Sequence, residues 1–301
     1  MIKKPVLGFV GFGEAAFSIC SGLALACAPV IYAYDVMAGS ETVGALIHSR
    51  ATQANVTLAA TLEQLIDQSD VILCATSAKY ALSIAKEAAA FLKPGKIYAD
   101  MNSASPMVKR EIAQVVDATG AHFADSAVME IVPPHKHRVP IAVSGSGAGE
   151  FASLLNPLQM NITYINDTAG SASSMKMFRS IFMKGMTALL TETLLASYQA
   201  GVCDEVMASI TKTLTEATPE QLANLLINRT AVAAERRISE MKDVKATLQA
   251  LGLPAFATEG TINRLQWFCD LGLKEYFNAT APADYRDVLR AATELNTKGE
   301  K

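Results

Sequence analysis

Short apolar runs alternate with amphipathic stretches over the first half of the chain. Apolar runs of strand length cover residues 5–12, 30–35, 70–77, 96–102, 122–129 and 140–145. Stretches with helical periodicity cover residues 14–27, 41–53, 61–69, 79–92 and 106–120. Strands and helices that alternate at this spacing predict a parallel sheet with helices on both faces.

The pattern changes at about Asp167, where strand-like runs largely stop. Residues 171–201 predict one long helix that is apolar nearly all round, so we expect it to be buried on most sides. Further helical periods follow at residues 203–214, 218–229, 232–251, 258–273 and 283–295. The second half of the chain is therefore predicted to be all helical.

Composition narrows the classes of function. Half of the 301 residues are apolar, 18% are charged and the net charge is −3, so a large core is expected and no nucleic-acid partner. The most apolar stretch, residues 173–200, carries four charged side chains and is not expected to span a membrane. The five cysteines form no C-x-x-C pair. Together these features favour a cytoplasmic protein with buried thiols.

A glycine motif joins the first predicted strand to the first predicted helix. Gly11, Gly13 and Ala16 form G-x-G-x-x-A, and Asp35 ends the next strand. This is the context of a dinucleotide site, with the pyrophosphate on backbone N–H groups at the helix N-terminus. The expected cofactor-binding loop is Gly11, Phe12, Gly13, Glu14 and Ala15. The alternative is a glycine-rich packing turn.

Asp35 also bears on the identity of the cofactor. A carboxylate there can accept hydrogen bonds from the ribose hydroxyls of NAD and would repel a 2′-phosphate, so NAD is favoured and NADP remains possible. Thr76 and Ser77 follow another strand and are expected near the cofactor, as is Asn102. Asn102 and Ser103 are candidates for contact with nicotinamide ribose or substrate. Each of these residues has an alternative role as a helix N-cap.

Four segments occur in the order and spacing of a known superfamily. They are GFVGFGEAA (8–16), ADMNSASP (99–106), DSAV (125–128) and the G-x-A-x-x-x-K start of the long helix (170–176). The chain thereby resembles the β-hydroxyacid dehydrogenase superfamily, which includes 6-phosphogluconate dehydrogenase. Residues 132–145, 184–197 and 233–241 resemble a poorly characterised branch with its own phosphogluconate-dehydrogenase-like C-terminal domain. The resemblance implies a dinucleotide-binding Rossmann domain over residues 1–166 and an all-α substrate and dimerisation domain over residues 167–301.

The resemblance implies that Lys176 is the general acid/base for hydride transfer. A free lysine is a poor base at pH 7, but desolvation in an apolar cleft lowers its pKa toward the working range. The alternative is a lysine whose side chain extends from a buried helix to solvent. Ser180 and Lys184 lie on the same helical face and are candidate substrate-binding residues. Relatives often carry asparagine near Ser180, and Lys184 is equally suited to pairing with a carboxylate.

The segment after residue 128 departs most from the better-known relatives. They have a serine and two glycines where this chain has Met129, Glu130 and Ile131, which makes Met129 and Glu130 candidate substrate contacts. A carboxylate there would repel an acid, so the substrate is not the ordinary short hydroxy acid or is bound elsewhere. The basic run 135–138 could supply positive charge, although an exposed Pro-Pro loop is favoured. No metal site is expected, because no third ligand accompanies the two histidines.

These observations predict an NAD(P)-dependent oxidoreductase that moves hydride between nicotinamide and a small hydroxy acid or related alcohol or carbonyl compound. A homodimer is expected, because so apolar a helix leaves much surface to cover. One alternative is an imine reductase-like enzyme, against which Lys176 argues. Another is a non-catalytic NAD-binding sensor, which the changed segment at Glu130 supports.

Overall fold

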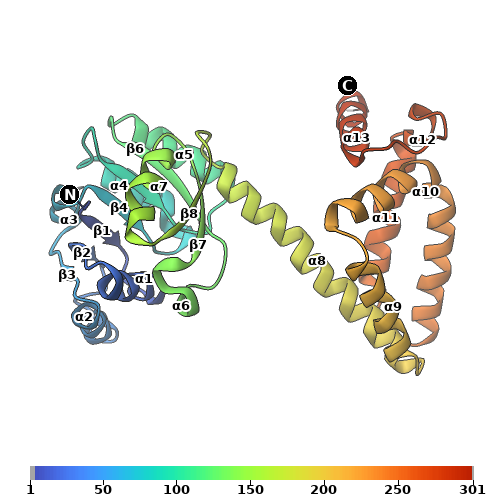
Figure 1. Ribbon diagram of the computed structural model, residues 1–301, viewed down its shortest axis with the longest axis horizontal. Coiled ribbons are helices and arrows are strands. Elements are labelled where there is room, and N and C mark those ends of the chain that lie inside the picture. Colours follow the sequence, from blue (N-terminus) through green and yellow to red (C-terminus); the bar gives the residue numbers. More distant parts are fainter. Residues whose placement is uncertain (1–3, 300–301) are drawn as a thin grey trace. The chain divides into compact units, whose positions relative to one another are not determined.

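The computed structural model describes residues 4–299 (Figure 1). The first three and last two residues of the two predicted domains lie outside this range. The chain divides into two compact units, Met1–Ser180 and Ile181–Lys301, and the division falls within the long helix α8 (Ser171–Gln199).

The first unit is built on one eight-stranded sheet with the order β3-β2-β1-β4-β5-β6-β7-β8. The strands are β1 (Leu7–Val10), β2 (Ile31–Tyr34), β3 (Thr57–Leu58), β4 (Val71–Cys74), β5 (Ile97–Asp100), β6 (His122–Val128), β7 (Pro140–Ser144) and β8 (Asn161–Asn166). All six predicted strands are present, and the predicted fold class is confirmed. The sheet is not parallel throughout, however, because β7 runs antiparallel to β6.

Helices cover both faces of this sheet (Figure 1). Buried side chains of α1 (Glu14–Ala26), α2 (Gly44–Gln53) and α7 (Ala148–Leu155) form one core cluster with the sheet. Those of α3 (Leu62–Gln68), α4 (Ala81–Ala89) and α5 (Pro106–Asp117) form a second. The short helices are α6 (Val132–His135), η1 (Ala78–Tyr80), η2 (Lys136–Arg138) and η3 (Asn156–Leu158).

The strand order reverses at β1, which pairs with β2 on one side and β4 on the other. Ligands of open α/β sheets bind in the crevice outside the carboxyl ends of the strands at such a switch point. Gly11 follows β1 and Thr76 follows β4, so the predicted loop residues lie at this position.

The second unit is helical. After α8 it contains α9 (Cys203–Thr215), α10 (Pro219–Ala250), α11 (Phe256–Asp270), α12 (Leu273–Tyr276) and α13 (Tyr285–Gly299). A small core joins α10, α12 and α13 through residues such as Ala231, Leu273 and Val288. The two helices expected over residues 218–251 meet at a kink within α10, where Ala233 has a non-helical backbone (φ −130°, ψ 22°), and a capping box of Thr218 and Gln221 begins the first of them. Among the described helices, none combines the length and apolar character that crossing a membrane requires.

Helix α8 is more exposed than its composition suggests. Phe178, Ile181 and Phe182 are 66%, 72% and 62% exposed in this single chain. The expectation of burial on most sides is therefore wrong for one copy of the chain. Apolar composition predicts that a helix will be covered, but it does not reveal whether the covering surface comes from the same chain.

Candidate cofactor and substrate site

The loop after β1 requires glycine at its first motif position. Gly11 has φ +85°, in the left-handed region, and a Cβ added there would lie 2.6 Å from the carbonyl oxygen of Ala75. The Gly11 N–H donates to the Tyr34 carbonyl oxygen at 2.8 Å. The backbone is thus held tightly between β2 and the residues that follow β4.

Gly13 differs from Gly11, because the space beside its Cα is not filled by any described residue. It is the N-cap residue of α1, and a Cβ added to it has no described atom within 4 Å. No side chain of the described residues caps this helix, so its first N–H groups are available to an anion. Ala15 is exposed beside it, and Glu14 is exposed in the first turn. The loop therefore fits the pyrophosphate of a dinucleotide.

Asp35 is oriented by two backbone donors. Its Oδ2 accepts from the Phe12 N–H at 2.7 Å, and its Oδ1 accepts from the Met37 N–H at 2.8 Å. Each carboxylate oxygen retains a lone pair for a ribose hydroxyl. Phe12 contributes to the loop only through its backbone, because its side chain is fully buried in the core.

Asn102 ties the ends of two strands together. Its side-chain oxygen accepts from the Thr76 N–H at 2.7 Å, while its amide nitrogen donates to Asp100. Both Asn102 and Thr76 line a cavity of about 350 Å³. Ser77 instead precedes η1 at the surface and is not among the residues that line it.

The cavity brings together residues from five parts of the sequence. The lining residues are Ala15, Ala75, Thr76, Ala78, Met101, Asn102, Ser103, Val128, Glu130, Ile131, Val132 and Lys176. Six of the residues predicted from the sequence meet here: Ala15, Thr76, Asn102, Ser103, Glu130 and Lys176. The nucleotide loop, the ends of β4 and β5, the segment after β6 and the first turns of α8 thus share one space.

Lys176 enters the cavity without a carboxylate partner among the described residues. Its Nζ donates to the Ser103 hydroxyl oxygen at 3.0 Å. Burial lowers the pKa of the Lys176 amine below its ordinary value, and the nearby charge of Lys109 lowers it further. An amine held in this way can exchange a proton more readily near neutral pH than a solvated lysine.

A second lysine lies deeper, in a cluster that the sequence analysis missed. Lys109 Nζ lies 3.0 Å from Asp100 Oδ2 and 3.1 Å from Asp125 Oδ1, and all three side chains are fully buried. Asp125 also accepts from the Ser173 hydroxyl at 2.6 Å, which connects the cluster to the start of α8. The available signal was two aspartates in adjacent buried strands, since Asp100, at the end of β5, pairs in register with Asp125, within β6. Two such carboxylates require a buried cation.

Three predicted substrate residues lie away from this cavity. Met129 packs among Ala127, Ala142 and Ala172. The Ser180 hydroxyl donates to the Lys176 backbone carbonyl at 3.1 Å, and Lys184 is exposed on α8. None of the three is among the residues that line the cavity.

The basic run over residues 135–138 is exposed at His135, Lys136 and Arg138, as expected, but it is not a loop. It forms the end of α6 and the turn η2, and η2 packs against α1. His137 is buried, and burial followed by the charges of Arg138 and Lys136 lowers its pKa, so this side chain is not a source of positive charge. His135 Nε2 lies 2.9 Å from Glu130 Oε2. Arg236 and Glu240, four residues apart on α10, form an exposed ion pair at 2.6 Å.

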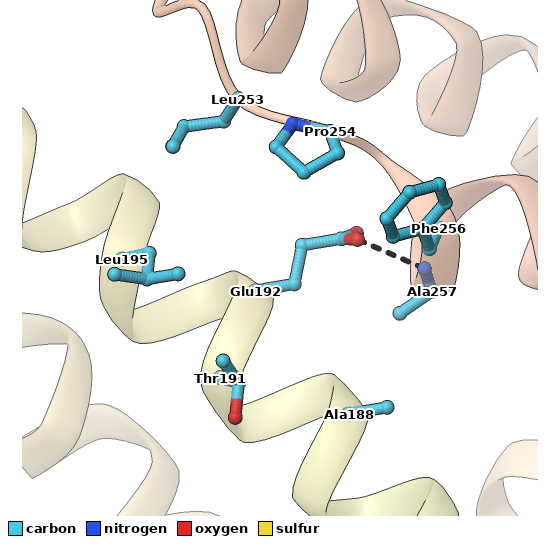
Figure 2. A pocket seen from close by; sticks show the side chains of 8 residues that line it. All are labelled: Ala188, Thr191, Glu192, Leu195, Leu253, Pro254, Phe256 and Ala257. Carbon is cyan, nitrogen blue, oxygen red and sulfur yellow. Dashed lines mark hydrogen bonds between the residues drawn. The ribbon is translucent and has the colours of Figure 1, made fainter.

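A separate cavity of about 250 Å³ lies within the helical unit (Figure 2). Glu192 of α8 extends toward the start of α11, where its carboxylate accepts from the N–H groups of Ala257 and Thr258, each at 2.8 Å. Although burial opposes the charged form, hydrogen bonds from Thr258 and Ala257 hold the pKa of Glu192 below its usual value. Glu192 therefore caps α11, and the surrounding wall is largely apolar.

Two family matches agree with this arrangement. Residues 7–132 match the NAD binding domain of 6-phosphogluconate dehydrogenase, and residues 198–268 match a domain of unknown function, DUF1932. A conserved hypothetical protein from Sinorhizobium meliloti is 32% identical over 88% of each chain, with a TM-score of 0.66. The chain therefore belongs to the 6-phosphogluconate dehydrogenase-like superfamily, in the branch that carries the DUF1932 domain.

Other solved structures place the fold among dehydrogenases and reductases. A conserved protein of unknown function, described as structurally similar to 3-hydroxyacid dehydrogenases, is 28% identical over 89% of this chain and 98% of that chain, with a TM-score of 0.63. An imine reductase from Aspergillus terreus, in complex with NADPH4, is 18% identical over 91% of this chain and 100% of that chain, with a TM-score of 0.70. At that identity the likeness is one of fold. The predicted NAD-binding domain is confirmed.

Proposed function

We propose that this protein is an NAD(P)-dependent oxidoreductase that acts on the CH–OH group of a small hydroxy acid or related alcohol, with Lys176 as general acid/base. The observation that carries the proposal is the position of Lys176 in one cavity with the nucleotide loop and the strand ends. Its lowered pKa and the absence of a described carboxylate partner support a proton-exchanging role.

In this proposal, each residue of the site has a role in cofactor binding or in proton transfer. The loop from Gly11 to Ala15 holds the pyrophosphate, and Asp35 accepts from the adenosine ribose. Bound NAD supplies the acceptor for hydride from the carbinol carbon. Lys176 takes the hydroxyl proton as the carbonyl forms, and returns it in the reductive direction. Ser103 accepts a hydrogen bond from the Lys176 amine and fixes its direction. Asp35 favours NAD over NADP.

Replacement of Lys176 tests this proposal. Lys176→Met should lower kcat by about 10²- to 10⁴-fold, the usual contribution of a general acid/base, and should leave the Kd for NAD unchanged. The matched control is Lys86→Met, an exposed lysine on α4, which should retain full activity. An unchanged kcat in Lys176→Met would contradict the mechanism. Tight NAD binding without turnover of hydroxy acids, alcohols, carbonyls or imines would favour a sensor, and turnover of imines alone would favour the reductase alternative.

We also propose that the active species is a homodimer. Phe178, Ile181 and Phe182 expose large apolar side chains on one stretch of α8, and such surfaces are usually covered by a partner. Light scattering after gel filtration should give twice the chain mass for the native protein. The double variant Phe178→Glu/Phe182→Glu should shift the protein toward the monomer, whereas a native monomer would refute this part of the proposal.

A further inference from the structure

The cavity lining carries a carboxylate, that of Glu130, which the proposed chemistry does not use. Among the described lining residues, Glu130 and Lys176 are the charged ones. The Lys176 amine must be neutral to accept a proton during oxidation. In that state Glu130 supplies the remaining charge among the described lining residues.

The local backbone explains why Glu130 borders the cavity. Side chains alternate between the two sides of an extended segment. Met129 packs inward against Ala127 and Ala172, whereas Val128 and Glu130 line the cavity. Ile131 is the N-cap residue of α6, and the last residue of that helix, His135, lies with its ring nitrogen 2.9 Å from the Glu130 carboxylate. The contact between Glu130 and His135 thus joins the two ends of the short segment 130–135 and orients the carboxylate.

This arrangement disfavours an acid as substrate. Like charges repel one another, so a substrate carboxylate beside Glu130 would be disfavoured. His135 balances the Glu130 charge only when its ring is protonated. The resemblance to the known hydroxyacid dehydrogenases would place a serine and two glycines here, as hydrogen-bond donors to an acid. This chain instead has Met129, Glu130 and Ile131, and the Glu130 carboxylate is a hydrogen-bond acceptor.

We propose that Glu130 binds an ammonium group of the substrate, so that the protein acts on a small amino alcohol and its amino carbonyl product. This assignment rests on the proposed function. The carbinol carbon loses hydride to bound NAD and its hydroxyl proton to Lys176, while the C–OH becomes C=O. The ammonium group takes no part in bond breaking and serves only as the handle that Glu130 holds.

Calorimetric titration in the presence of saturating NAD⁺ tests this assignment without turnover. The probes are 3-amino-1-propanol and 3-hydroxypropanoate, which differ mainly in the sign of their charge. The native protein should bind the amine about tenfold more tightly or better, and Glu130→Gln should lose about tenfold in affinity for the amine. Glu130→Lys should reverse the preference. The control Glu111→Gln, at an exposed site on α5, should change neither Kd.

The outcomes separate this assignment from the general function. Tighter binding of the acid by the native protein, equal or undetectable affinity for the two probes, or an unchanged Kd for the amine in Glu130→Gln overturns the role of Glu130. Oxidation of hydroxy acids together with one of these results leaves the proposed dehydrogenase function standing. If the protein prefers the amine but oxidises no probe with NAD, the proposed dehydrogenase function is refuted, whereas the ammonium-binding role of Glu130 stands. Thermal melting of each variant verifies that it is folded.

Discussion

Two lysines near the same strand ends have opposite surroundings. Lys109 is fully buried and lies within 3.1 Å of two carboxylates, and its ammonium also donates to the Asp100 carbonyl oxygen at 2.7 Å. Lys176 is partly buried, and among the described residues its contact is the neutral hydroxyl of Ser103. One ammonium is compensated on several sides, whereas the other is desolvated without compensation.

The difference assigns the two lysines to different tasks. The Lys109 cation is the counter-charge of two buried carboxylates, and removal of its side chain would leave those charges unpaired. An amine that is desolvated without a counter-charge is biased toward its neutral form. Lys109 therefore joins β5, β6, α5 and α8 through buried ion pairs and hydrogen bonds, and Lys176, which has no such pairing among the described residues, is the lysine proposed to exchange a proton.

The same substitution at the two lysines should therefore give opposite results. Lys109→Met leaves two buried carboxylates without a partner and should lower the free energy of unfolding by about 3–5 kcal/mol. Lys176→Met removes no ion pair and should change it by about 0.5 kcal/mol or less. Urea denaturation of both variants measures the difference. Similar losses in the two variants would refute the distinction.

The two glycines of the nucleotide loop also differ in their surroundings. Gly11 packs against the protein backbone, whereas Gly13 has open space beside its Cα. Gly11→Ala requires a left-handed alanine, which costs about 1–2 kcal/mol, and places its Cβ against the Ala75 carbonyl oxygen. The added methyl of Gly13→Ala meets no described protein atom within 4 Å, so this variant should change the melting temperature little. It should raise the Kd for NAD by about tenfold, because its methyl group obstructs the pyrophosphate. A destabilised Gly13→Ala with unchanged NAD affinity would contradict this assignment.

A similar contrast holds between carboxylates. Asp125 is buried and paired with Lys109, whereas Asp35 accepts two backbone N–H groups and is proposed to bind the adenosine ribose. Asp35→Asn should lower the ratio of NAD to NADP affinity by about five- to tenfold, because it removes the charge that repels a 2′-phosphate. Fluorescence titration with both cofactors measures this ratio, and an unchanged ratio would show that another residue sets the preference.

Periodicity and the glycine motif were enough to predict most of the fold and the nucleotide loop. The pattern of apolar residues predicts six strands and the long helix. The G-x-G-x-x-A motif predicts where the ligand-binding edge of the sheet lies. The two-residue strand β3 is too short to give a pattern, and β8 at the sheet edge has an irregular sequence of exposed and buried positions. Helix α7 was also missed, because its eight residues follow a glycine-rich turn.

The site was predictable only where a side chain belongs to a motif. Lys176, Asn102 and Ser103 follow strand ends or the helix start that the resemblance defines, and they meet in the cavity. The Lys109 cluster depends on strand register between residues distant in sequence. Met129 was wrongly expected in the cavity. Successive side chains of an extended segment point to opposite sides, so only one of the neighbours Met129 and Glu130 faces the cavity, and the sequence does not show where the strand ends.

The pH dependence of kcat for alcohol oxidation tests the central claim most directly. Because the neutral Lys176 amine accepts the proton, kcat should rise with pH through a single ionisation whose pKa lies below the ordinary lysine value of about 10.4, and then level off. Reduction should show the opposite trend. The account predicts that Lys176→Met loses this rise along with most of its activity. The same rise in Lys176→Met at comparable kcat would contradict it.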